Sequence, residues 1–306
     1  MLCVEFGLTS TSTGVDYRCD HEGYEMRAIA TIATIECLPG LQLLVSSLRR
    51  RGWTDPVNVF VPAGLRKFDL PEGCVQHRLD NWWDAKPPTR TDPGHAPRRH
   101  RTTLEHVCNV PALGKPDVFL SFKDGDEVLY LDGADVLVLE NPMTLLDLFE
   151  ASGKALGAHP YEPAAQGLSA EHPDQFFLAR LLASAKLGQR YNDGVILARM
   201  DCRVRLFMHY WKMVLGHAAY LGTFVGAGAR RTVVGDQVAF NICIGSLGAY
   251  GEVWDFPKEW NYRGYANVNL CQVNGDGLFT PDGTRVLIAH ASGSRSFRSD
   301  IAGLGR

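Results

Sequence analysis

The stretch AIATIAT, residues 28–34, decides the fold class, because small and β-branched apolar residues without polar alternation are typical of a strand buried on both faces. The stretch LQLLVSSL, residues 41–48, has helical spacing and runs into three arginines before Gly52, the mark of a helix C-terminus. The stretch VNVFV, residues 57–61, predicts a second strand. A strand, a helix and a strand in succession predict a parallel sheet with right-handed connections, and therefore an α/β fold.

The same two patterns predict further elements along the chain. Apolar runs that predict strands lie at 127–131, 136–139, 155–158, 194–198 and 286–289. Helices are predicted at 145–150, 176–187 and 204–215, and residues 118–122 are interpreted as the end of a short helix. The glycine-rich stretch 216–228 is interpreted as a connection.

Size and composition are those of an ordinary globular protein. The chain has 306 residues, of which 45% are hydrophobic and 21% charged, with a net charge of −3, so its charge predicts no binding to nucleic acid or to anionic membranes. No apolar run reaches the roughly 18 residues of a membrane-spanning helix, and the N-terminus lacks a signal-peptide pattern. We therefore expect a cytoplasmic protein whose eight cysteines are reduced, since none forms a CxxC pair.

The expected domain organisation is one large domain, residues 26–306, preceded by an N-terminal extension, residues 1–25. Residues 80–111 fit no clear element and contain two adjacent tryptophans, several prolines and a basic cluster. Such a stretch is either a mobile surface loop or an active-site lid, since exposed aromatic rings can stack on ligands and arginines hold anionic groups. The composition leaves both interpretations open.

Two carboxylates stand where the chain must turn between apolar runs, in YLDGADVLV, residues 130–138. Asp132 and Asp135 lie in an apolar frame, where carboxylates are costly unless a cation or close hydrogen bonds compensate them. Their oxygens suit Mg²⁺ or Mn²⁺, which keep positions open for phosphate oxygens. Gly133 adds no bulk, so backbone and ligand can approach closely. The segment therefore predicts a metal site. The alternative is that the two acids simply lie in a solvated turn.

The sequence also resembles glycosyltransferase family 8, which includes glycogenin and bacterial galactosyltransferases. The metal-binding Asp-x-Asp segment of that family is similar to residues 130–138, and other segments match in the family's order. They are TIAT at 31–34, Lys115, YNDGV at 191–195, DQVAFN at 236–241, PKEWN at 257–261 and HASGSR at 290–295. The resemblance covers roughly residues 27–297. It implies the GT-A fold, a single Rossmann-like domain with a mixed, mostly parallel central sheet flanked by helices.

The resemblance implies an activity as well. It is retaining, hexosyltransferase-type sugar transfer from a nucleotide-sugar donor, for which the family suggests a UDP-sugar, with Mn²⁺ or Mg²⁺ at the diphosphate. The sequence identifies neither the acceptor, a small molecule or a glycan, nor the oligomeric state. A self-glycosylating role like that of glycogenin would need an accessible acceptor tyrosine, and none of the ten tyrosines stands out.

Site residues follow from the matched segments. The implied metal ligands are Asp132, Asp135 and His290. The implied donor-binding residues are Thr31, Ala33, Thr34, Lys115, Asp132, Gly133, Asn192, Gly194, Gly293 and Arg295. The implied catalytic residues are Asp236, Gln237 and Asp193. Asp236 and Gln237 would lie near the anomeric carbon, and Asp193 would bind a donor hydroxyl or a cationic acceptor. Plainer roles are also open, because Asp236 can be a helix N-cap and Asn-Asp-Gly is an ordinary turn signal.

Three positions depart from the family pattern. Asp132 and Asp135 are separated by one extra residue, and side chains at i and i+3 share a strand face only where the chain turns or bulges. We therefore expect Asp135 to be the more secure direct ligand. Asp193 replaces a small or hydroxyl residue. Arg295 replaces a lysine and keeps the charge for a phosphate.

Two other classes of protein remain as alternatives. A sugar-1-phosphate nucleotidyltransferase can use a related α/β core, but a glycine-rich basic loop is usual after its first strand, and residues 36–40 contain no basic residue. A sugar-nucleotide-binding protein without catalytic activity would follow if the altered acid pair no longer binds metal. Donor hydrolysis distinguishes this last class from an enzyme.

Overall fold

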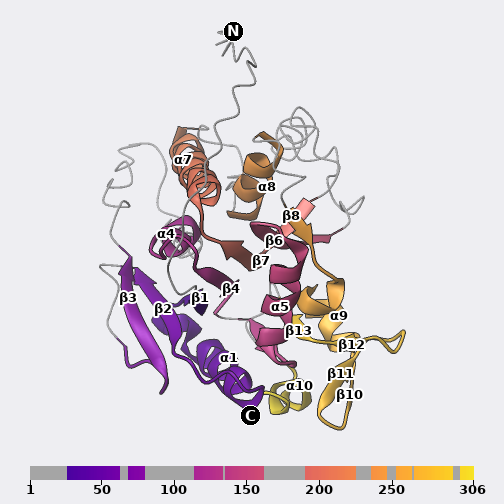
Figure 1. The fold of residues 1–306 in the computed structure, drawn as a ribbon. Coiled ribbons are helices and arrows are strands. Elements are labelled where there is room, and N and C mark those ends of the chain that lie inside the picture. The colour runs from indigo at the N-terminus through magenta and orange to yellow at the C-terminus, as the bar shows by residue number, and fades with distance from the viewer. Residues whose placement is uncertain are drawn as a thin grey trace, which may run out of the picture.

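The computed structural model describes residues 26–62, 68–79, 114–133, 135–161, 190–224, 236–246, 253–263, 265–291 and 297–306. Within them, a seven-stranded sheet forms the centre of the molecule (Figure 1). Its strands in spatial order are β3 (Cys74–Leu79), β2 (Val57–Pro62), β1 (Arg27–Ile32), β4 (Glu127–Leu131), β7 (Arg190–Arg199), β6 (Leu156–Tyr161) and β8 (Val253–Asp255). β7 is antiparallel to both β4 and β6, and the other neighbouring pairs are parallel.

The βαβ unit predicted at the start of the domain is confirmed. A short 3-10 helix, η1 (Ile35–Cys37), leads from β1 into α1 (Leu38–Arg50), with Pro39 in its first turn. Arg49 and Arg50 occupy the last turn, and Gly52 has a φ of 90°, which suits the reversal after a helix. β1 and β2 then pair in parallel, with Ile29 opposite Val57.

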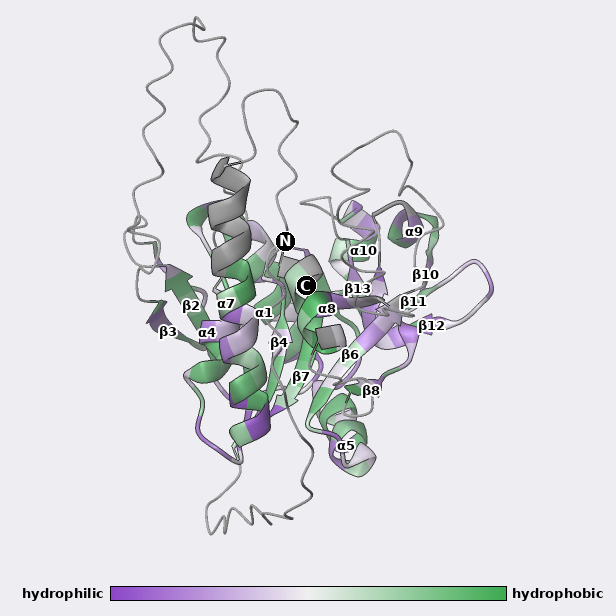
Figure 2. Ribbon diagram, turned by 90° about the horizontal axis from the view of Figure 1, so that it is seen from above, coloured by the Kyte–Doolittle hydropathy of each residue, from purple (hydrophilic) through white to green (hydrophobic). Residues whose placement is uncertain are grey.

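Helices cover both faces of the sheet. Helices α4 (Lys115–Leu120), α7 (Cys202–Phe224) and α8 (Asp236–Ser246) lie on one face, and α1 and α5 (Pro142–Ser152) lie on the other (Figure 1). The alternation along β4 explains this sandwich: Tyr130 belongs to the apolar cluster under α7, and Leu131 to the cluster under α1. Figure 2 shows the apolar character of the central strands and the mixed surface of α7.

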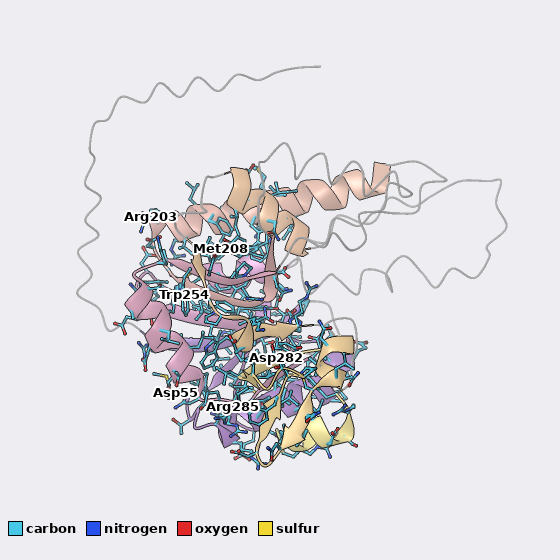
Figure 3. All side chains as sticks on the ribbon, turned by 90° about the vertical axis from the view of Figure 1, so that its right-hand side faces the viewer. Asp55, Arg203, Met208, Trp254, Asp282 and Arg285 are labelled. Atoms are coloured by element: carbon cyan, nitrogen blue, oxygen red, sulfur yellow. The ribbon has the colours of Figure 1, made fainter. Side chains whose placement is uncertain are left out.

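The C-terminal part adds two small three-stranded sheets. In one, β13 (Ile288–His290) lies between β5 (Val136–Val138) and β9 (Tyr262–Arg263). The other is the antiparallel meander of β10 (Gln272–Asn274), β11 (Gly277–Phe279) and β12 (Arg285–Val286). Three short helices accompany them: η5 (Lys258–Asn261), α9 (Tyr265–Leu270) and α10 (Ser299–Gly303). Figure 3 draws the side chains and labels Asp282 and Arg285 of this region together with Trp254 of β8.

Most predicted elements correspond to observed ones, with two corrections. The connection predicted to begin at Gly216 is wrong as far as Phe224, because α7 continues to that residue; its alanines favour a helix enough to tolerate glycine. The single strand predicted at 286–289 is two strands, because the chain passes from the meander to the other small sheet at Leu287. The extension at 1–25, the stretch 80–111 and the helix at 176–187 lie outside the described residues.

In the part of the chain that the structure describes, no helix combines the length and the apolar character needed to cross a membrane.

Candidate metal and donor site

The two acids of the predicted metal segment lie on either side of a turn that joins the two main parts of the molecule. Asp132 follows β4 of the central sheet, and its N–H donates to the Gly194 carbonyl at 2.9 Å. Asp135 precedes β5 of the small sheet, and its carbonyl accepts from the Ala291 N–H at 2.9 Å. The chain therefore turns between the two acids. Such a turn is what two side chains three residues apart need in order to approach the same ion.

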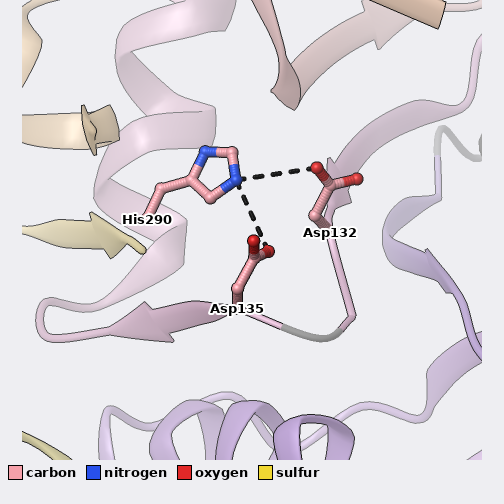
Figure 4. A group of neighbouring side chains, drawn as sticks. All are labelled: Asp132, Asp135 and His290. Carbon is pink, nitrogen blue, oxygen red and sulfur yellow. Dashed lines mark ion pairs between the residues drawn. The ribbon is translucent and has the colours of Figure 1, made fainter. Parts of the chain in front are cut away.

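His290 completes a cluster with these acids (Figure 4). Its Nε2 lies 3.6 Å from Asp132 Oδ2 and 3.4 Å from Asp135 Oδ1. One ligand atom from each residue lies within 4.8 Å of the others. The imidazole is buried, with 2% of its side chain exposed, while Asp132 is 27% and Asp135 18% exposed. The cluster is thus closed on the histidine side and accessible on the carboxylate side.

The donor set fits a divalent cation of the Mn²⁺ or Mg²⁺ type. Carboxylate oxygens suit both ions, and an imidazole nitrogen is a common third ligand for transition metals. Two ligands that are each ~2.1 Å from one ion and are cis to each other lie about 3 Å apart. The observed separations of 3.4 and 3.6 Å are close to that value. The three residues that the resemblance implied as metal ligands are therefore together in space.

Two glycines allow this close packing. A Cβ atom on Gly194 would lie 2.1 Å from His290 Cε1 and 2.8 Å from Asp132 Oδ2. A Cβ atom on Gly133 would lie 2.6 Å from Thr31 Oγ1 and 2.8 Å from the Ile32 carbonyl. Side chains at these positions would displace the metal cluster or the end of β1, so their lack of bulk is a steric requirement of the site.

Lys115 lies beside the cluster and is almost fully buried. Its Nζ is 3.1 Å from Asp132 Oδ1 and 3.2 Å from Asp193 Oδ2, and it donates to the Asp193 carbonyl at 3.0 Å. It also lies over the Tyr130 ring, whose hydroxyl donates to Asp132 Oδ1 at 3.1 Å. The side chains of Lys115 and Asp193 are 3% and 6% exposed. A buried ammonium needs such partners, since an unpaired one carries a large desolvation cost.

Among the ionisable side chains that the structure describes in this group, negative charges outnumber positive ones. Asp132, Asp135 and Asp193 contribute three negative charges when ionised, and Lys115 contributes one positive charge. With a neutral imidazole, two negative charges remain within a few ångströms of one another. A divalent cation at Asp132, Asp135 and His290 would compensate both.

Behind His290 lie two buried asparagines. His290 Nδ1 is 3.1 Å from Asn261 Oδ1, and Asn261 Nδ2 donates to Asn192 Oδ1 at 2.8 Å. Asn192 Oδ1 also accepts from the Gly194 N–H at 3.1 Å. The family resemblance implied Asn192, while Asn261 and the Tyr130 hydroxyl were not among the predicted site residues. The PKEWN segment was the available signal for Asn261, but no local pattern connects it with His290.

The remaining predicted residues are distributed as follows. Thr31 and Ala33 are fully buried at the end of β1, with Thr34 8% exposed beside them. Thr31 Oγ1 has no hydrogen-bond partner within the described ranges, so a polar atom faces the site unpaired. Gly293 and Arg295 lie outside those ranges.

Asp236 and Gln237 begin helix α8, while their side chains are not among those described. The helix is anchored to the site strand through Asn241, whose side chain accepts from the Tyr191 N–H at 2.6 Å and donates to the Tyr191 carbonyl at 2.8 Å. Tyr191 directly precedes Asn192 and Asp193. The middle of α8 is therefore tethered to the strand that carries Asn192 and Asp193, and the roles of Asp236 and Gln237 stay predictions.

A neutral histidine lies at the edge of the same region. His159 of β6 is opposite Asn192 in the sheet, and its ring Nδ1 is 3.2 Å from the Phe256 carbonyl oxygen. Burial lowers the pKa of His159 below the ordinary value, although the contact with Phe256 and the nearby Glu259 and Asp255 act in the opposite direction. The ring therefore adds no positive charge to the acidic cluster at neutral pH.

Comparison with known proteins identifies the fold. No protein-family model and no curated protein matches the sequence. The structure is similar to the galactosyltransferase LgtC in complex with donor and acceptor sugar analogues, with a TM-score of 0.56 and 15% identity over 92% of this chain and 95% of that one. An active-site mutant of LgtC gives a TM-score of 0.53 and 16% identity over 91% and 95%. At such identities the likeness concerns architecture, and the central sheet with helices on both faces is the expected GT-A fold.

Proposed function

We propose that this protein is a metal-dependent glycosyltransferase that transfers a sugar from a nucleotide-sugar donor to an acceptor hydroxyl. The observation that carries the proposal is the cluster of Asp132, Asp135 and His290 at the C-terminal end of β4. Ligands of α/β proteins bind at the C-terminal ends of parallel strands, and the neighbouring β1 ends there with Thr31 and Thr34. The likeness to a galactosyltransferase that binds donor and acceptor sugars supports the same reaction class.

Each residue has a proposed role in that reaction. A divalent ion held by Asp132, Asp135 and His290 would act as a Lewis acid that offsets the charge developing on the diphosphate leaving group. Lys115 adds a positive charge beside the same phosphates, and the end of β1 receives the nucleotide. Asp193 holds the Lys115 ammonium next to Asp132. By the family resemblance, Gly293 and Arg295 would also bind the phosphates.

The finer features of the proposal follow from the family resemblance. They are a UDP-sugar as donor, Mn²⁺ as the preferred ion, transfer of a hexosyl group and retention of the anomeric configuration. By the same resemblance, Asp236 and Gln237 would lie near the anomeric carbon and the acceptor. The helix that they begin, α8, is tethered to β7 through Asn241 and Tyr191. The single domain of residues 26–306 and its location in the cytoplasm belong to the same proposal.

A panel of nucleotide-sugars tests the proposal directly. Purified protein is incubated with each donor and either Mn²⁺ or chelator, and thermal stability and donor hydrolysis are both measured. We expect one UDP-sugar to stabilise the protein and to be hydrolysed slowly with Mn²⁺, and both effects to disappear in chelator.

Each alternative gives a different result in the same assay. Stabilisation by a donor without any hydrolysis would favour a sugar-nucleotide-binding protein without catalytic activity. Formation of a nucleotide-sugar from a nucleoside triphosphate and a sugar 1-phosphate would favour a nucleotidyltransferase. No response to any donor under either condition would contradict the proposal.

A further inference from the structure

The feature of interest is the ring nitrogen of His290 that faces away from the acid cluster. His290 Nδ1 lies 3.1 Å from Asn261 Oδ1, and its Nε2 faces Asp132 and Asp135. His290 is 2% exposed and Asn261 is fully buried. Water is therefore excluded from this contact, and the two side chains determine each other's hydrogen-bonding state.

The direction of each hydrogen bond in this group follows from a backbone N–H. The Gly194 N–H can only donate, so the Asn192 side-chain atom at 3.1 Å must be its oxygen. That same oxygen lies 2.8 Å from Asn261, which must therefore present its NH₂ group to it. The amide oxygen of Asn261 then points at His290 Nδ1. Because an oxygen can only accept, Nδ1 carries the proton, and in the neutral imidazole Nε2 then has the free lone pair.

Reversing the direction of any hydrogen bond in this series places two donors or two acceptors against each other at a buried position. Turning the Asn261 amide would place its NH₂ group against the N–H of His290 and its oxygen against the oxygen of Asn192. Unsatisfied polar groups at buried positions are costly, and Asn192 is itself only 2% exposed. The sequence of bonds from Gly194 through Asn192 and Asn261 therefore selects one tautomer of His290.

We propose that Asn261 is a positioning residue for the metal: it keeps His290 in the Nδ1–H tautomer, so that the Nε2 lone pair is directed between Asp132 and Asp135. This inference rests on the proposed metal-dependent function. Metal-bound histidines commonly donate their second ring N–H to a neighbouring acceptor, which fixes both the tautomer and the ring orientation. Here the acceptor is itself oriented, in two steps, by the backbone of the strand that carries Gly194.

The proposal also links three sequence segments that lie far apart. Asn261 is separated by 69 residues from Asn192 and by 29 residues from His290. YNDGV supplies the backbone donor and the first amide, PKEWN supplies the second amide, and HASGSR supplies the imidazole. An asparagine with a purely structural role would satisfy buried polar groups without affecting the tautomer of His290. The tautomer is therefore the property that separates the two roles.

The first test is ¹⁵N NMR of the histidine side chains in the full chain without metal, at about pH 8.5, where ordinary imidazoles, with pKa values near 6.5, are neutral. The protein has ten histidines, and the signals of His290 are assigned as those missing from His290→Gln. We expect the shift of a protonated nitrogen for Nδ1 and of an unprotonated one for Nε2. The opposite assignment in the wild-type protein would overturn the proposal.

The second test measures the affinity of Mn²⁺ by calorimetry for three further variants and for His290→Gln, the reference for a lost ligand. Asn261→Leu removes both the acceptor and the donor, and we expect it to bind Mn²⁺ about 10–100-fold more weakly, the usual effect of losing such a partner. Asn261→Asp keeps an acceptor for the Nδ1 proton, so its affinity should lie closer to that of the wild type. Asn58→Leu is the matched control, because Asn58 lies on β2, two strands from β4, and its Oδ1 is 2.8 Å from Nε2 of His77 on β3.

The outcomes separate this inference from the proposed function. Mn²⁺ binding by the wild type together with equal binding by Asn261→Leu would overturn the role of Asn261 and leave the proposed function standing. A wild-type protein that binds no Mn²⁺ would contradict the proposed metal-dependent function itself. Should Asn261→Leu fail to fold, the wild-type tautomer and the affinity of Asn261→Asp still decide the question, since an Asp variant as weak as His290→Gln contradicts the proposal.

Discussion

The two ends of strand β4 carry acids in different electrostatic surroundings. At its start, Glu127 is 2% exposed and has two arginines: Arg27 Nε is 3.1 Å from one carboxylate oxygen and Arg199 Nη2 is 2.6 Å from the other. At its end, Asp132 and Asp135 lie near Asp193, and among the described residues Lys115 is the cation paired with Asp132 and Asp193. The first end is compensated by the chain itself, while at the second the described side chains leave an excess of negative charge. This contrast is what distinguishes a structural ion pair from a binding site.

The largest effect is expected for removing an acid at the uncompensated end. Asp135→Asn should reduce metal-dependent donor hydrolysis roughly 10²–10⁴-fold, because a bound metal supplies several kcal/mol of charge stabilisation and each 1.36 kcal/mol is a factor of ten. In chelator its stability should be unchanged or higher, because repulsion among the acids is relieved. Asp147→Asn, an exposed acid beside Arg27, is the control that keeps its activity. Full activity in Asp135→Asn would contradict the claim that the acids at the end of β4 form a metal site, whereas Glu127 at its start forms a structural ion pair.

The next largest effect concerns the lysine. Lys115→Met leaves Asp193 and Asp132 without their ammonium, and removing one partner of a buried pair costs about 3–5 kcal/mol. We expect a loss near the lower limit in chelator, measured by urea denaturation, because Asp132 is partly exposed. Added Mn²⁺ should recover part of it. Lys212→Met breaks a partly exposed pair with Asp117 and should cost no more than ~1 kcal/mol. Equal losses in the two variants would mean that burial does not strengthen the Lys115 pair.

A smaller effect is expected at the compensated end. Glu127→Gln should lower the free energy of unfolding by about 1–3 kcal/mol, less than for a fully buried pair because Arg27 and Arg199 are partly exposed. The affinity for Mn²⁺ should stay within twofold of the wild type. Denaturation and calorimetry on the same sample check both statements. A variant that loses Mn²⁺ binding while remaining folded would show that the two ends are coupled.

The smallest effect is a change with pH. Burial holds the pKa of His159 below its ordinary value, so below about pH 6.5 the unfolded chain binds a proton that the folded chain resists. The contribution of His159 to stability is therefore complete above that pH and is lost as the pH falls toward the lowered pKa. His159→Gln should flatten the loss of stability between neutral and acidic pH in thermal denaturation. An unchanged slope would assign the acid sensitivity to other groups.

Local patterns in the sequence predicted the elements whose signals are local. Each of three elements has an apolar pattern or a terminal signal within a few residues. They are the strands β1 and β4 and the helix α1, which ends with its arginines and Gly52. The sheet order was not predictable in this way, since β7 lies between β4 and β6 and runs antiparallel to both. Strand pairing depends on contacts between distant residues, which no local pattern encodes.

The candidate site divides along the same line. Asp132 and Asp135 stood out because apolar runs flank them, whereas His290 was reached only through the order of the family's segments. Asn261 was missed because its role depends on contacts with Asn192 and His290, which are far away in the sequence. The steric role of Gly194 likewise depends on the imidazole that packs against it. Chemistry that depends on distant contacts was visible only in the folded chain.

One measurement tests the central claim most directly: calorimetric titration of Mn²⁺ into the chelator-treated wild-type protein and into Asp135→Asn. The account predicts one bound ion per chain for the wild type and at least ~10-fold weaker binding for the variant, because one of the three ligands is lost. No binding by the wild type, or equal binding by both proteins, would contradict the claim that the acids at the end of β4 form a metal site.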